Sequence, residues 1–135
     1  MSEELGFEVR MDIPCGEAID EATEALEAEG FRVLMKIEID QAFRDEMGTH
    51  FRPYTILGAC NPQLARAALT IAPEIGLMLP CNVTVEADIT GSVVRIMNPE
   101  ILMQTKKLWF DDALRSVAKD AAMRLMRVAD ELRAG

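Results

Sequence analysis

The chain is poor in the residues from which several common kinds of site are built. It has three cysteines, one histidine, and 14 lysines and arginines against 23 aspartates and glutamates. An odd number of widely spaced cysteines is a poor disulfide framework, so we expect reduced thiols. The only histidine, His50, has a spacing to Cys60 and Cys81 that matches no standard zinc site. We therefore predict neither a metal nor a cofactor.

Long apolar runs and basic stretches are missing as well. The chain begins with no basic segment followed by an apolar one, so we expect no secretory signal. The longest nearly uncharged stretch, residues 55–83, is broken by three prolines, whereas a membrane helix needs about 20 predominantly apolar residues. A formal net charge of -9 repels phosphate backbones and anionic lipids. We expect a cytoplasmic protein that binds neither nucleic acid nor a membrane.

What is present suffices for one folded domain. Half of the 135 residues are hydrophobic, and a chain of this length can bury a single core without disulfides or metal. The sequence contains no internal repeat, low-complexity segment or linker. We therefore interpret residues 1–135 as a single domain.

Alternation of apolar and polar residues predicts five strands. In the second strand Phe31, Met35 and Ile39 are expected to share one face, and in the fourth strand Val83 and Ile89 are expected to point inward. Clean alternation favours an antiparallel sheet with one face in water. The predicted strands are residues 7–13, 31–39, 52–59, 82–89 and 92–97.

Helical spacing predicts three helices and an additional short turn. A helix over residues 16–29 ends at Gly30, and a turn around Phe43 and Met47 ends at Gly48. Asn61 and Pro62 open a middle helix, and a long last helix runs from residue 111 or 112 to about 133. Residues 100–110, with Trp109 and Phe110, form an apolar connection. The predicted fold class is two-layer α+β, in the order β-α-β-β-α-β-β-α, with helices on one face of the sheet.

Two Cys-Asn dipeptides bracket the middle helix and mark the segment that could carry chemistry. Cys60-Asn61 ends the third strand and Cys81-Asn82 begins the fourth. If these strands are antiparallel neighbours, the two cysteines come close together. Cys60 also precedes a helix N-terminus, where unpaired N–H groups favour an anion and would lower the pKa of a thiol. Such a pocket could hold a small anion, a thiolate or a soft metal.

Three interpretations of this segment stay open. The first is a small-ligand or redox-linked binding module. The second is a structural or interaction protein in which the cysteines act as small hydrophobic residues, as free cysteine usually does. The third, an enzyme with Cys60 as nucleophile, is disfavoured because no base is apparent in the sequence. No catalytic residue is predicted, and the predicted ligand-binding residues are Cys60, Asn61, Cys81, Asn82, Arg52 and Tyr54.

The same segments carry a resemblance to a known family. Residues 51–54, 57–62 and 76–83, which read FRPY, LGACNP and GLMLPCNV, are similar to the signature of the bacterial and archaeal domain of unknown function family 302. The resemblance implies a fold similar to one repeat of the TATA-box-binding protein, and a homodimer. It implies no reaction, substrate or cofactor, so no catalytic residue is transferred. Fold likeness alone does not imply DNA binding.

Overall fold

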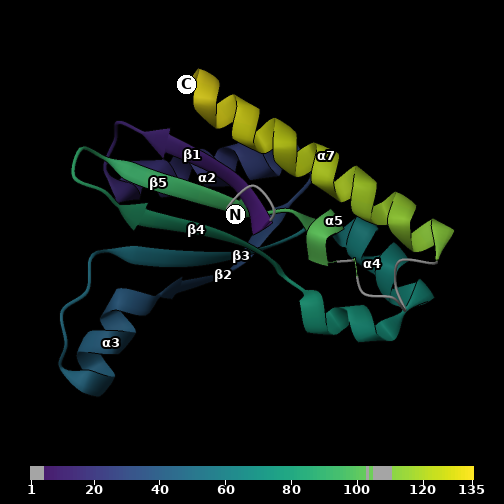
Figure 1. The fold of residues 1–135 in the computed structure, drawn as a ribbon, viewed down its shortest axis with the longest axis horizontal. Helices are drawn as coiled ribbons and strands as arrows, with labels where there is room; N and C mark the ends of the chain where they lie inside the picture. The colour runs from purple at the N-terminus through teal and green to yellow at the C-terminus, as the bar shows by residue number, and fades with distance from the viewer. Residues whose placement is uncertain (1–4, 103, 105–110) are drawn as a thin grey trace.

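The computed structural model describes residues 5–102, 104 and 111–135, and these form a five-stranded sheet with helices packed against it (Figure 1). The predicted α+β class is confirmed. The predicted connection over residues 100–110 falls largely outside the described residues, as do Trp109 and Phe110. In chain order the elements are β1 (Gly6–Met11), α2 (Cys15–Ala28), β2 (Arg32–Glu38), α3 (Ile39–Met47), β3 (Tyr54–Cys60), α4 (Pro62–Ile71), η1 (Pro73–Met78), β4 (Cys81–Ala87), β5 (Ser92–Met97), α5 (Pro99–Leu102) and α7 (Asp112–Ala134).

The sheet has the strand order β1-β5-β4-β3-β2, and every neighbouring pair is antiparallel. β3, β4 and β5 lie inside the sheet, while β1 and β2 form its edges. The middle helix α4 leaves the end of β3, and the chain returns through η1 to the start of β4, its neighbour. The predicted antiparallel pairing of these two strands is therefore confirmed.

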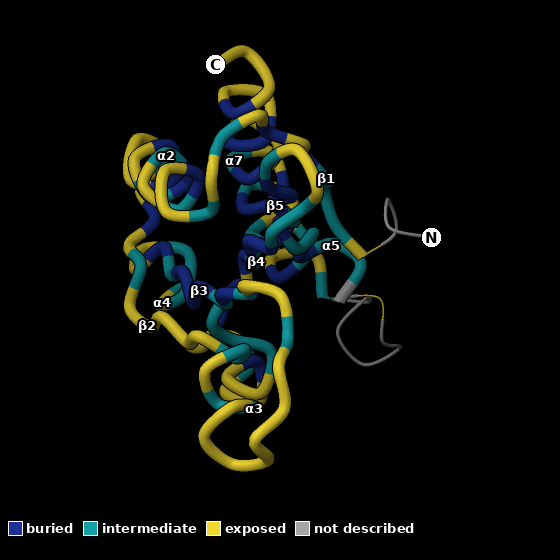
Figure 2. Tube along the Cα trace, turned by 90° about the vertical axis from the view of Figure 1, so that its left-hand side faces the viewer, coloured by how far each residue is buried: buried dark blue, intermediate teal, exposed yellow. Residues whose placement is uncertain are grey.

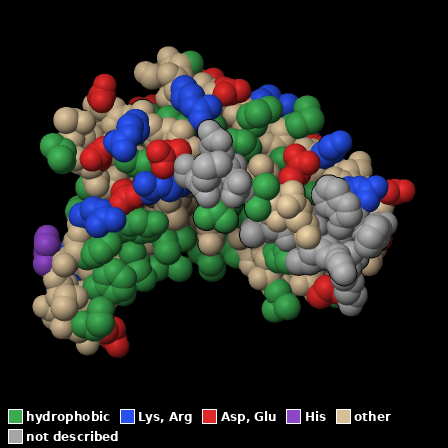
Figure 3. All heavy atoms as spheres, in the orientation of Figure 1, with side chains coloured by type: hydrophobic (Ala, Val, Ile, Leu, Met, Phe, Trp, Pro, Cys, Tyr) green, Lys and Arg blue, Asp and Glu red, His purple; other side chains and the backbone are tan. Residues whose placement is uncertain are grey.

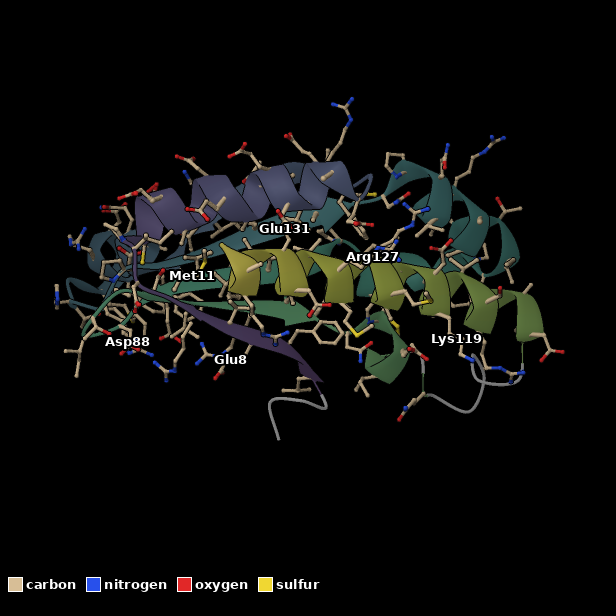
Figure 4. The ribbon with its side chains drawn as sticks, turned by 90° about the horizontal axis from the view of Figure 1, so that it is seen from above. Glu8, Met11, Asp88, Lys119, Arg127 and Glu131 are labelled. Atoms are coloured by element: carbon tan, nitrogen blue, oxygen red, sulfur yellow. The ribbon has the colours of Figure 1, made fainter. Side chains whose placement is uncertain are left out.

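One face of the sheet is covered by α2 and α7, which lie side by side (Figure 4). Arg127 of α7 pairs with Glu29 at the end of α2 across 2.9 Å. Apolar side chains of both helices meet those of β3, β4 and β5 in one core. Fully buried members include Leu26, Leu57 and Leu125. Burial of this apolar surface is the main source of stability for such a domain.

Helix boundaries follow from capping chemistry. The side chain of Asn61 accepts a hydrogen bond from the backbone N–H of Leu64 at 3.2 Å, and Asp111 caps α7 through Leu114 at 2.9 Å. Gly48 ends α3 with φ +65, a conformation that glycine adopts without steric cost. The predicted turn near Phe43 and Met47 is therefore a helix of nine residues.

Among the described residues, the other face of the sheet is open between α3 and η1, which project from its two ends (Figure 1), and both β2 and α3 are largely exposed (Figure 2). The predicted single apolar face of the second strand is wrong, because the register of β2 shifts between Val33 and Met35. This irregularity keeps Phe31 buried but leaves Met35 45% exposed on the open face. Ile89, predicted to point inward, lies in the β4–β5 turn and is 98% exposed. Within the described residues, no helix is both long and apolar enough to span a membrane.

Candidate functional site

Cys60 and Cys81 come together at the ends of two paired strands. Ala59 of β3 is the direct partner of Cys81 of β4, so Cys60 is one residue beyond that pair. The side chain of Cys81 lies in the main core with Val83, as strand parity predicted, and Cys81 is 7% exposed. Cys60 is half-buried. The proximity expected from the sequence is therefore present.

Both cysteines line a cavity of about 70 Å³ between the sheet end, α4 and α7. Among the described residues, its wall is apolar apart from Asn61, and both ends of that amide are already engaged. The Asn61 oxygen caps α4, and its nitrogen donates to the backbone carbonyl of Glu29 at 3.5 Å. The other lining residues are Phe31, Leu64, Ala65, Ala68, Ile75, Met78, Leu79, Met97, Pro99, Val117, Ala118 and Ala121.

The expected activation of the Cys60 thiol is wrong. Burial raises the pKa of Cys60 above its ordinary value of 9.0. At the adjoining helix N-terminus, the N–H of Leu64 already donates to the side chain of Asn61. Burial, with a smaller contribution from the nearby Cys60, raises the pKa of Cys81 to about 11. Both thiols are therefore protonated at neutral pH, and the thiolate is the reactive form of cysteine.

The two thiols are close enough to affect each other. Cys60 contributes to the raised pKa of Cys81, and both residues line the same cavity at the end of the β3–β4 pair.

The remaining predicted residues lie on the open face. Tyr54 and Asn82 line a hollow of about 340 Å³. Arg52 precedes β3, and its Nε donates to Glu86 Oε2 at 2.5 Å. Adjacent residues such as Cys81 and Asn82 are separated by the sheet itself, so the six predicted residues divide into two groups. Cys60, Asn61 and Cys81 line the cavity, whereas Tyr54 and Asn82 line the hollow on the opposite face.

A charged network on the open face was not predicted. The carboxylate of Glu86 is only 9% exposed and binds both Arg52 and Arg95. Arg95 in turn donates to Glu8 at 2.9 Å. Burial alone would raise the pKa of Glu86, but hydrogen bonds from Arg95 and Arg52 outweigh it and hold that pKa below its usual range. The alternation of apolar and polar residues in the fourth strand places Glu86 on the polar face of the sheet. Nothing in the neighbouring sequence indicates that its carboxylate is buried.

The family model described as "Domain of unknown function DUF302" matches residues 7–132. The chain belongs to the DUF302 family. A crystal structure of an uncharacterized conserved DUF302 protein from Bacillus stearothermophilus is similar, with 28% identity and a TM-score of 0.84. That match covers 96% of this chain and 98% of the other. No curated protein gives a significant match.

Membership of DUF302 assigns no reaction, so the chemistry must be judged from the two groups of residues. In the part of the chain that the structure describes, no cluster of three or more histidine, cysteine and acidic side chains could hold a metal ion. His50 is exposed in the segment before β3. An apolar cavity with neutral thiols favours the binding of apolar molecules over nucleophilic chemistry.

Proposed function

We propose that this DUF302 protein is a binding module for a small apolar molecule, which occupies the cavity beside Cys60 and Cys81. The observation that carries the proposal is the nature of the wall: of the described residues that line it, Asn61 alone has a polar side chain, and the hydrogen bonds of that amide are satisfied by protein. A cavity without free polar groups holds water poorly, and apolar cavities bind apolar ligands. The cysteines contribute polarizable surface to this wall.

Size limits the ligand. Engineered apolar cavities of about 150 Å³ accept benzene or xenon, and the present cavity has about half that volume. The cavity is only partly enclosed, so a short alkyl chain or a small ring could enter in part. The protonated state of Cys60 and Cys81 gives no support to a thiolate-dependent redox step at neutral pH.

Xenon and benzene are suitable probes for this proposal. We expect either probe to shift the NMR methyl signals of Leu64, Ala68 and Val117, which line the cavity. Ala65→Leu should fill the cavity and remove these shifts. Ala67→Leu, a matched change on α4 outside the cavity wall, should leave them unchanged. Absence of shifts in the unmodified protein, or equal shifts in both variants, would show that the cavity takes no apolar ligand.

A second candidate function is self-association, for which an exposed apolar patch on β2 is the specific observation. Leu34, Met35 and Ile37 are 65%, 45% and 42% exposed, and apolar side chains gather on the underside of the molecule near α3 (Figure 3). Residues 32–38 carry two bases and one acid in a chain of net charge -9. Repulsion between two copies is therefore weaker there than the net charge of the whole chain would suggest. The bulge in β2 and Lys36 discourage edge-to-edge strand pairing, so contact would use the faces.

Sedimentation analysis tests this second candidate. We expect the unmodified protein to sediment as a dimer, and the double variant Met35→Glu with Ile37→Glu to sediment as a monomer. Met123→Glu is the matched control, because Met123 is 53% exposed on α7, away from the patch. A monomer at concentrations of tens of micromolar would contradict self-association, and a dimer that survives the double variant would place the contact elsewhere.

A further inference from the structure

The segment between β3 and β4, residues 61–80, stands apart from the sheet that it interrupts. It carries α4 and η1, leaves the sheet after Cys60 and returns at Cys81 (Figure 1). The pairing of β3 with β4 reaches its end at Ala59 and Cys81, so the two strands are joined on the sheet side of this segment. Residues 61–80 can therefore move away from the rest of the molecule while these strand pairs stay formed.

Few side chains fasten this segment to the rest of the molecule. Among residues 62–79, all of which the structure describes, only Ala68 and Ile75 are buried, whereas α7 contains eight buried residues. Leu77 of η1 is 92% exposed although it is apolar. Parts of a protein with few buried apolar contacts open locally at a lower free energy than the core does. We therefore expect α4 and η1 to open more readily than the sheet.

The two buried residues belong to a small apolar cluster that is separate from the main core. Ala68 and Ile75 pack with Leu114 and Ala118 of α7, and among the described elements α4 packs chiefly against α7 and η1. Alanine contributes little apolar surface to such a contact. The cavity proposed above as a ligand site lies between this cluster and the main core, since its lining includes Ala68, Ala118 and also Phe31 of the main core. Unfilled volume at this boundary weakens it further.

We propose that residues 61–80 form a lid on the cavity, which opens when α4 and η1 move away from α7 while the sheet stays folded. The inference rests on the proposed apolar-ligand function for its purpose, because opening admits and releases the ligand, as lids do in many proteins. Asn61 fixes one end of the lid. Its side chain accepts a hydrogen bond from the backbone N–H of Leu64 at 3.2 Å and donates to the Glu29 carbonyl at 3.5 Å.

Hydrogen exchange of backbone amides in the unliganded protein tests the lid directly. After correction for the intrinsic rate of each amide, we expect those of α4 to exchange at least about 100-fold faster than those of β5. Val94→Ala and Ile75→Ala separate local opening from global unfolding. Val94 is fully buried in the main core, which stays intact when the lid opens. Val94→Ala should therefore accelerate exchange in β5 about tenfold or more and leave α4 within about twofold, whereas Ile75→Ala, which weakens the lid contact itself, should accelerate both.

Benzene connects the lid to the proposed function. At a free concentration of about nine times its Kd, benzene should slow the exchange of the α4 amides about tenfold, because the cavity holds the probe only while the lid is closed. The methyl shifts described above report independently whether benzene binds. If benzene produces no shifts, the apolar-ligand function fails, while the exchange measured without ligand still decides whether residues 61–80 open as a lid.

Three results would overturn the inference. The first is exchange of the α4 amides that is as slow as that of the β5 amides in the unmodified protein. The second is a Val94→Ala variant that accelerates α4 and β5 by the same factor, because α4 would then open only when the whole domain unfolds. The third is benzene that binds, as judged by the methyl shifts, without slowing exchange in α4, because opening would then not release the ligand.

Discussion

Raising the pH above 9 should weaken the folded state through the thiol of Cys81. This thiol has a pKa of about 11 in the folded protein, against 9.0 as its ordinary value. A group whose pKa is raised by folding contributes stability below the unfolded pKa, and that contribution is lost as the pH rises toward the folded pKa. With about 1.4 kcal/mol for each pKa unit, the loss should reach about 2 kcal/mol at pH 10.5 and approach about 3 kcal/mol above pH 11.

Urea unfolding at pH 8 and pH 10.5, with a reductant present, isolates this effect. Other groups also titrate in this range, so the comparison is between the unmodified protein and Cys81→Ala. The alanine variant should be less stable at pH 8, because it loses buried volume, but it should lose about 2 kcal/mol less between the two pH values. Cys15→Ala should behave more like the unmodified protein, since Cys15 is only half-buried. Parallel pH profiles for the unmodified protein and Cys81→Ala would refute the reasoning.

Three further substitutions probe the contacts around the two groups of residues. Glu86→Gln should cost about 2 kcal/mol in urea unfolding, because two arginines lose a buried carboxylate, while Asp88→Asn on the exposed Arg10 pair should cost less than about 1 kcal/mol. Gly58→Ala should lower the melting temperature, since the added Cβ would lie 2.8 Å from the ring of Pro80, at a cost of about 1–3 kcal/mol. Asn61→Ala should cost about 1–2 kcal/mol and reduce helix content by circular dichroism, because α4 loses its cap.

The elements predicted most accurately from the sequence are those in which the spacing of apolar residues continues without interruption. The fifth strand was placed at its observed bounds, and the last helix within a residue or two, because alternation and helical spacing are local signals. The prediction for the second strand failed at Met35, which is exposed on the open face. A bulge inserts one residue into one strand of a pair, and its position depends on the partner β3, which local periodicity does not report.

The candidate site was half predictable for a related reason. The prediction that the third and fourth strands pair as antiparallel neighbours was correct, and this pairing brings Cys60 and Cys81 together. Grouping Asn82 with Cys81 failed, because adjacent positions in a strand lie on opposite faces of the sheet. The thiol chemistry failed because the sequence revealed the helix N-terminus but not the burial of Cys60. In the folded chain, Asn61 satisfies that terminus and burial controls the pKa.

Alternate residues of β4 face opposite sides of the sheet: one set faces the core and the cavity, and the other set faces the hollow. Substitutions along β4 should therefore alternate between large and small losses of stability. Cys81 and Val83 are buried under the helices, whereas Asn82 is exposed and Thr84 lines the hollow. We expect Val83→Ala to cost about 2 kcal/mol or more in urea unfolding, and Asn82→Ala to cost less than about 0.5 kcal/mol. If Asn82→Ala were as destabilising as Val83→Ala, the two faces of β4 would not differ in burial, and the division of the predicted residues between the cavity and the hollow would be contradicted.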